Sequence, residues 1–147
     1  MIKQVLRTAF IALGVGFLVE LLRSWLSSNF LQDFFEGNLI TILVALLAIN
    51  AATMGIVLTK IRDLIDEKGG GQVFENTKKN MLLSVKEQIG LIVLATVVLS
   101  VKSSPLLANV QNFSLFLDSI VSGIFVYALL VLYDTAKGVL VIVDFDG

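Results

Sequence analysis

The sequence contains no cysteine and no histidine. Their absence excludes disulfide bonds, thiol nucleophiles, zinc sites built from these residues, and the side chain that most often acts as a general base at neutral pH. The carboxylates that remain, without a Ser/Lys pair in an apolar segment, offer little to catalysis. We therefore expect a protein that is not an enzyme and that carries no metal or cofactor.

Charge is also scarce in this chain. Only 16% of the residues are charged, and the formal net charge is −1. A nucleic-acid partner would call for a basic patch or stripe, which this balance does not favour. By contrast, 56% of the residues are hydrophobic and the mean hydropathy is +0.91. These values are typical of a chain whose surroundings are a lipid bilayer, and we expect the bilayer to be its main partner.

Four apolar segments approach the roughly 20 residues that a helix needs to cross a hydrocarbon layer about 30 Å thick. We place them at about residues 5–26, 39–59, 84–102 and 113–133. The second segment contains no charged residue, whereas a surface helix of a soluble bundle needs a polar stripe. The sequence predicts an all-α integral membrane protein, a single four-span domain over residues 1–147 whose transmembrane helices form two hairpins.

Lys and Arg are distributed unevenly between the connecting segments, and this asymmetry sets the expected orientation. With a cytoplasmic N-terminus, two basic residues lie outside, Arg23 and Lys102, and nine lie inside. Those nine are Lys3, Arg7, Lys60, Arg62, Lys68, Lys78, Lys79, Lys86 and Lys137. We therefore predict a multi-pass protein with both termini in the cytoplasm and short external loops near residues 27–38 and 103–112.

Residues 60–88 form the only substantial polar connection. Helical apolar stripes leave the second span and enter the third, and Gly69-Gly70-Gly71 separates the two halves. We expect helices 2 and 3 to extend into the cytoplasm as an amphipathic antiparallel hairpin that turns at these glycines. The tail at residues 134–147 contains the aliphatic run 139–143. This run fits a strand, an interfacial segment or a continuation of the fourth helix, and it needs cover from the hairpin or from another subunit.

Small residues spaced four apart mark faces where membrane helices approach closely. They occur in three of the spans. The helix-packing candidates are Ala12 and Gly16 in the first span, Ala48, Ala51, Ala52 and Gly55 in the second, and Ser119 and Gly123 in the fourth. Such faces serve packing within one four-helix bundle or between copies in a homo-oligomer, and the sequence does not separate these alternatives.

Ionisable side chains inside a membrane are costly and often functional. Glu20 and Asp118 are predicted to lie at similar depth in the outer half, because the first and fourth helices run in opposite directions. Arg23 and Lys102 are within reach of that layer. These four residues fit either a neutralised structural network or an acidic ring around a pore. Asn50, near the middle of the second span, fits either a structural hydrogen bond or a pore constriction.

Two functions remain open at this point. The first is a homo-oligomeric ion-conducting pore or channel. The second is a non-conducting membrane anchor or accessory subunit that recruits a cytosolic protein partner through residues 60–88. The architecture resembles that of small bacterial four-span membrane proteins, some of which act as membrane-disrupting effectors in antiviral or toxin systems. This resemblance implies a bacterial inner-membrane location and a membrane effector role as an extension of the pore hypothesis.

Overall fold

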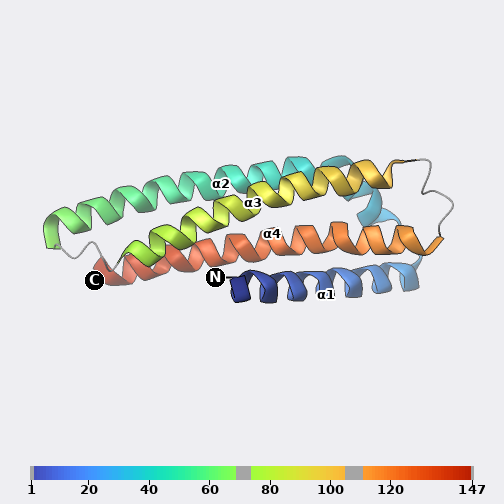
Figure 1. Ribbon diagram of the computed structural model, residues 1–147, viewed down its shortest axis with the longest axis horizontal. Helices are drawn as coiled ribbons and strands as arrows, with labels where there is room; N and C mark the ends of the chain where they lie inside the picture. Colours follow the sequence, from blue (N-terminus) through green and yellow to red (C-terminus); the bar gives the residue numbers. More distant parts are fainter. Residues whose placement is uncertain (1, 69–73, 105–110, 147) are drawn as a thin grey trace.

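The computed structural model describes residues 2–68, 74–104 and 111–146. Its elements are α1 (Ile2–Leu26), α2 (Phe30–Lys68), α3 (Glu75–Lys102) and α4 (Gln111–Asp146). The described residues contain no strand, and all four helices run lengthwise beside one another (Figure 1). Each helix is long and apolar enough to cross a membrane. The all-α prediction is confirmed, and the four apolar helices indicate a multi-pass membrane protein.

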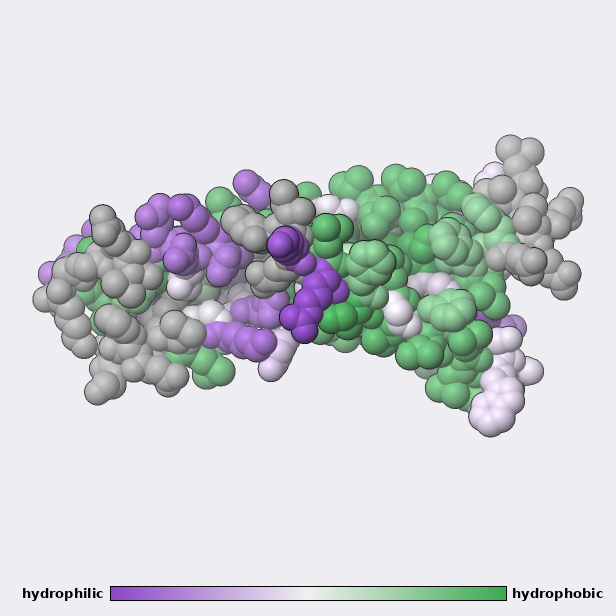
Figure 2. Space-filling view, turned by 60° about the horizontal axis from the view of Figure 1, so that its bottom comes forward, coloured by the Kyte–Doolittle hydropathy of each residue, from purple (hydrophilic) through white to green (hydrophobic). Residues whose placement is uncertain are grey.

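Two of the four helices are much longer than the spans predicted for them. α2 has 39 residues and α4 has 36, so each extends over more than 50 Å at about 1.5 Å per residue, well beyond a hydrocarbon layer of about 30 Å. α1, with 25 residues, runs along only one half of the molecule (Figure 1). That half carries most of the apolar surface, whereas hydrophilic residues gather towards the opposite end (Figure 2).

The connection between α1 and α2 is much shorter than the predicted loop at residues 27–38. Ser27 has a positive φ of 50°, and the backbone N–H groups of Ser27 and Ser28 donate to the carbonyls of Ser24 and Arg23. This pair of bonds closes the end of α1 as a Schellman motif. α2 then begins at Phe30, so Gln32 and Glu36 lie on a helix where a loop was expected. The predicted glycine turn at residues 69–71 and most of the predicted loop at residues 103–112 lie outside the described residues.

Three helices form the main body of the fold. α2 packs on α3 and on α4, and α3 packs on α4, whereas the extensive contact of α1 is with α4 alone. One buried apolar cluster fills the half that α1 covers, and a second lies in the extension beyond it. The second cluster contains Val57, Ile61, Leu64, Phe74 and Met81. α2 and α3 therefore extend side by side beyond the half that α1 covers.

The C-terminal tail is the continuation of α4, which settles one alternative left open by the sequence. The helix runs on to Asp146, so the aliphatic run at residues 139–143 is not a strand. Val139 packs against the second apolar cluster, and a β-carbon added at Gly138 would lie 3.6 Å from the Met81 side chain. The extended α2–α3 pair thus contacts this tail at Gly138 and Val139, whereas Leu140 is exposed.

The small-residue faces fall into two groups. Ala12 and Gly16 of α1 and Ser119 and Gly123 of α4 are all buried where the two helices meet. The four candidates of α2 are exposed, so within the described chain they do not pack against another helix of the bundle: these are Ala48, Ala51, Ala52 and Gly55. Small size predicts close approach, but it does not say whether the neighbour belongs to the same chain.

Candidate functional site

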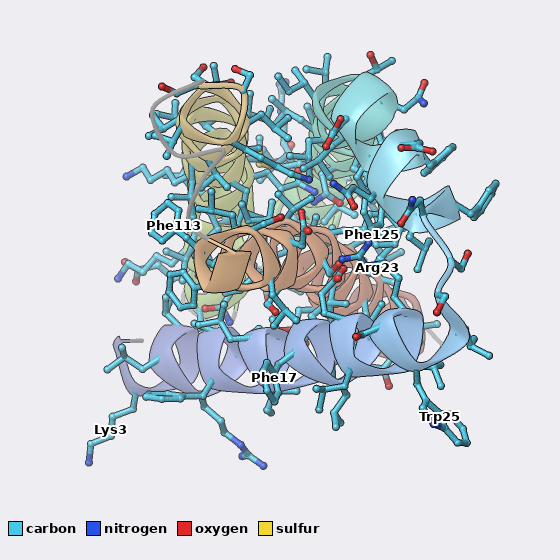
Figure 3. The ribbon with its side chains drawn as sticks, turned by 90° about the vertical axis from the view of Figure 1, so that its right-hand side faces the viewer. Lys3, Phe17, Arg23, Trp25, Phe113 and Phe125 are labelled. Atoms are coloured by element: carbon cyan, nitrogen blue, oxygen red, sulfur yellow. The ribbon has the colours of Figure 1, made fainter. Side chains whose placement is uncertain are left out.

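Arg23, near the end of α1, is the centre of a buried polar network. Its Nε donates to Glu20 Oε2 at 2.6 Å, and its Nη2 lies 3.3 Å from Asp118 Oδ2. Its Nη1 donates to the Gln32 side chain at 2.8 Å. Figure 3 shows Arg23 pointing from α1 towards the body of the bundle, whereas Phe17 and Trp25 of the same helix point away from it. Arg23 therefore links α1 to α4 and to the start of α2.

Lys102, the last residue of α3, completes the network from the other side. Its ammonium group pairs with Asp118 and lies 2.7 Å from Glu36 Oε1. Ser122 donates to Glu20 at 3.1 Å, and Ser114 donates to Asp118 at 3.4 Å. Through these contacts all four helices meet at one level. We call this group the Arg23 network: Glu20, Arg23, Gln32, Glu36, Lys102, Ser114, Asp118 and Ser122.

The Arg23 network is unequal in charge. Three carboxylates, from Glu20, Glu36 and Asp118, face two bases, so three minus two leaves a formal charge of −1. Glu20 and Asp118 are almost completely buried, whereas the side chain of Glu36 is 47% exposed. A buried charge is tolerated only when it is paired and hydrogen-bonded. The pairing explains how two acids are accommodated in apolar segments, and Glu36 gives the network one edge at the surface.

A cleft opens beside this network. It has a volume of about 470 Å³ and lies at the end of the bundle where α1 ends and α4 begins. We call it the Lys102 cleft, and its polar lining consists of Gln32, Glu36, Lys102, Ser103 and Ser114. Four of these five residues belong to the Arg23 network and the fifth, Ser103, directly follows Lys102, so the buried charges are adjacent to an open surface.

A second cleft lies at the opposite end of α1. It has a volume of about 260 Å³ and is bounded by the first residues of α1, the first half of α3 and the later part of α4. We call it the Glu87 cleft, and its polar lining consists of Thr8, Thr77, Asn80, Ser84, Glu87, Asp134, Thr135 and Lys137. Tyr127, which is 8% exposed, lies beside Glu87. A second polar layer therefore faces the other end of the membrane-spanning half.

The two polar layers are separated by a short apolar layer. Along α4, Ser122 belongs to the Arg23 network and Tyr127 lies five residues later, a rise of about 7.5 Å. Ile124 fills this interval, packed in one cluster with Leu43 of α2 and Ala95 of α3. A constriction of this kind excludes water while its walls are apolar and closely packed. The fold thus places a thin apolar layer between the Arg23 network, beside the Lys102 cleft, and Tyr127, which lies next to Glu87 of the second cleft.

The structure brings together four of the five polar candidates from the sequence. Glu20, Arg23, Lys102 and Asp118 form one network, and Asn50 lies elsewhere, buried between helices. Sequence reasoning missed Glu36, which it placed in an external loop. The signal that could have found Glu36 is its spacing of four from Gln32, which puts both side chains on one face of a helix.

Comparisons of the chain with protein-family models, curated proteins and solved structures gave no match. The geometry of the polar layers therefore carries the functional argument. Acidic side chains, hydroxyl groups and a separating apolar layer are the parts from which proton paths in membrane proteins are built.

Proposed function

We propose that this protein conducts protons across a membrane, and that the path runs inside each chain between the Lys102 cleft and the Glu87 cleft. The observation that carries this proposal is the Arg23 network, which holds an excess carboxylate in the membrane-spanning half beside an open cleft. Intramembrane carboxylates that are paired with bases are recurrent elements of proton relays.

The burial of these polar residues favours a path inside each chain and not a pore on an axis between copies. Glu20 is 2% exposed, Asp118 is 3% exposed and Asn50 is 1% exposed. An acidic or amide ring around an axis between subunits needs these side chains on the outer surface of each subunit. The sequence-based idea that they line such a ring is replaced here by a path through the bundle.

The size of the bundle favours protons over larger hydrated cations. The two clefts are separate, and the layer around Ile124 is closely packed. A hydrated cation needs a continuous aqueous path, whereas a proton needs only carboxylates, hydroxyls and a transient file of water. The rise of about 7.5 Å between Ser122 and Tyr127 is short enough for a few water molecules to bridge.

The experiment is a flux measurement on purified protein in lipid vesicles. A pH gradient is imposed, potassium and valinomycin clamp the membrane potential, and an internal pH dye reports proton entry. We expect the protein to collapse the gradient faster than protein-free vesicles, and Asp118→Asn to slow this collapse strongly. A potassium gradient without valinomycin should persist. Absence of proton flux at every protein density contradicts the proposal.

The matched control is Asp33→Asn. Asp33 is an exposed carboxylate in the first turn of α2, outside the Arg23 network. Its loss should leave the proton flux unchanged. Glu20→Gln gives a second variant in which the side chain still accepts hydrogen bonds, so that loss of flux is separable from loss of folding. Equal flux in the unmodified protein, Asp118→Asn and Glu20→Gln would remove the network from the path.

We also propose that copies of this chain associate through α2, which retains the homo-oligomer predicted from the sequence. Its exposed small residues repeat at alternating steps of three and four, the spacing of a helix–helix seam. We call these residues the α2 seam: Ala45, Ala48, Ala52, Gly55 and Thr59. The Thr59 hydroxyl donates to the Gly55 carbonyl, so the seam presents no free hydroxyl proton to a neighbouring helix.

The alternative of an anchor that recruits a cytosolic partner has less support. The apolar stripes of the α2–α3 extension are buried against each other and against α4. What remains available there is a mixed-charge surface with local pairs such as Arg62–Asp66 and Lys79–Glu75. Such exposed pairs contribute little binding energy. The bacterial effector role rests on architectural resemblance, and the proton-conduction proposal does not depend on it.

A further inference from the structure

Asn50 of α2 and Gln88 of α3 are buried amides without a hydrogen-bond partner among the described residues. Each residue is only 1% exposed. All four of their side-chain nitrogen and oxygen atoms are unsatisfied within this part of the chain. A buried amide left in this state costs about 1 to 3 kcal/mol, so two of them in one protein call for an explanation.

The two amides lie at the same level of the α2–α3 pair. Glu36 and Lys102 form an ion pair between these antiparallel helices and so fix their register. Asn50 lies 14 residues after Glu36, and Gln88 lies 14 residues before Lys102. Both positions are therefore about 21 Å from the ion pair along their helices. Equal steps along antiparallel helices bring the two residues opposite each other.

The neighbouring residues set this level apart from the rest of the interface. On one side lie residues of the first apolar cluster, including Leu43 and Leu91, and on the other side lie Val57 and Met81 of the second cluster. The amides thus occupy a break between two apolar clusters. If these two positions served only to pack α2 against α3, apolar side chains would fill them without the free-energy cost of a buried, unsatisfied amide.

The chemistry of the two amides selects the ligand. Each amide offers one oxygen acceptor and an NH₂ group with two donors. A bound cation would use the two oxygens and leave both NH₂ groups unsatisfied. Water accepts from NH₂ groups and donates to oxygens, and a buried water typically makes two to four such bonds. We infer that Asn50 and Gln88 form a binding site for water in the interior of the bundle.

The position of this site connects it to the Glu87 cleft. Gln88 follows Glu87, whose side chain lines the cleft, and both residues lie in the same turn of α3. If the proposed proton path is correct, on which this step rests, the water held by the two amides carries protons between the cleft and the apolar layer at Ile124. The site would then lie on the Glu87-cleft side of the apolar layer.

Water at the amides is measurable without any flux assay. Solid-state NMR of the protein in lipid vesicles follows the transfer of magnetisation from water to side-chain NH₂ groups. The signals of Asn50 and Gln88 are assigned by their loss in Asn50→Leu and Gln88→Met. Two internal controls are available: the exposed Asn38 side chain marks fast transfer, and the backbone amide of the buried Ala95 marks slow transfer.

We expect the Asn50 and Gln88 signals to gain magnetisation at a rate near that of Asn38. A rate no faster than that of Ala95 overturns the water site. In the flux assay, Asn50→Leu and Gln88→Met should fold normally, because each replaces a buried amide by an apolar side chain of similar size. Both variants should conduct more slowly than the unmodified protein and than Asn38→Leu. Unchanged flux in both variants overturns the role of this water in the path.

The same measurements separate this inference from the proposed function. Fast water transfer to both amides in a protein that shows no proton flux supports the site and removes the conduction proposal. A second outcome is a proton flux that is lost in Asp118→Asn but unchanged in Asn50→Leu and Gln88→Met. This outcome supports conduction and overturns the role given to this water.

Discussion

The backbones of Gly16 in α1 and Gly123 in α4 are in contact. A β-carbon built at Gly16 would lie 2.5 Å from the Gly123 amide nitrogen and 2.6 Å from the Ser119 carbonyl oxygen. Real β-carbons do not approach backbone atoms so closely, so any larger residue at position 16 forces the helices apart. Because α1 has its extensive contact with α4 alone, this close approach sets the distance between the two helices, across which Arg23 reaches Asp118.

Gly16→Ala should therefore weaken the attachment of α1. We expect a loss of about 1 to 3 kcal/mol, the usual cost of overpacking a close contact, measured by thermal unfolding in detergent micelles. Gly14→Ala is the matched control, because a β-carbon there meets nothing within 4 Å. It should be neutral or slightly stabilising. Equal stability of the two variants would show that the α1–α4 contact is looser than this geometry.

Arg23→Gln should be the most destabilising single change in the polar network. It removes the basic partner of Glu20 and one of the two basic partners of Asp118. Breaking a buried ion pair in this way typically costs about 3 to 5 kcal/mol. Unfolding in detergent measures the loss, and Arg7→Gln, at an exposed position of the same helix, is the control.

The double variant Arg23→Gln with Glu20→Gln tests the cause of that loss. It removes the unpaired carboxylate as well as the guanidinium, so much of the stability should return. If the double variant is as unstable as Arg23→Gln alone, the cost lies in lost packing of the arginine side chain and not in an uncompensated charge.

Hydropathy and spacing predicted the four helices because an apolar segment in lipid has few options other than a helix that satisfies its own backbone. The reversal of direction between the first and fourth spans also predicted that Glu20 and Asp118 lie at similar depth. Glu36 was missed because its charge was assigned to a loop, whereas a helix can begin with charged residues when bases from other helices cover them.

The faces of the helices were harder to predict than their lengths. Hydropathy gives the extent of a span, but it does not fix which side of a uniformly apolar helix faces the bundle. The small residues of α1 and α2 therefore looked equivalent, although Gly16 is buried and Gly55 is exposed. Gln88 was hidden for a similar reason: next to Lys86 and Glu87 it looked like a head-group residue, and only the register of α2 and α3 places it opposite Asn50.

The α2 seam predicts a specific cross-link between copies. The chain has no native cysteine, so Ala52→Cys introduces a single thiol. Mild oxidation in membranes should yield disulfide-linked dimers, visible on a non-reducing gel. Phe10→Cys in α1, an exposed position 75% accessible, is the control and should cross-link far less. Equal cross-linking at both positions would mean random collision and would remove α2 as the contact between subunits.

The apolar layer between the two clefts predicts a variant with increased flux. Ile124 is 3% exposed, and Ile124→Thr introduces a hydroxyl group that is able to bond to the carbonyl four residues earlier in α4. The polar wall should admit water to the barrier more often, so proton flux into vesicles should rise above that of the unmodified protein. Ile56→Thr, at a position of α2 that is 73% exposed, changes the same side chain away from the path and should leave the flux unchanged. A lower or equal flux in Ile124→Thr, with folding intact, would show that the barrier to proton movement lies elsewhere in the chain.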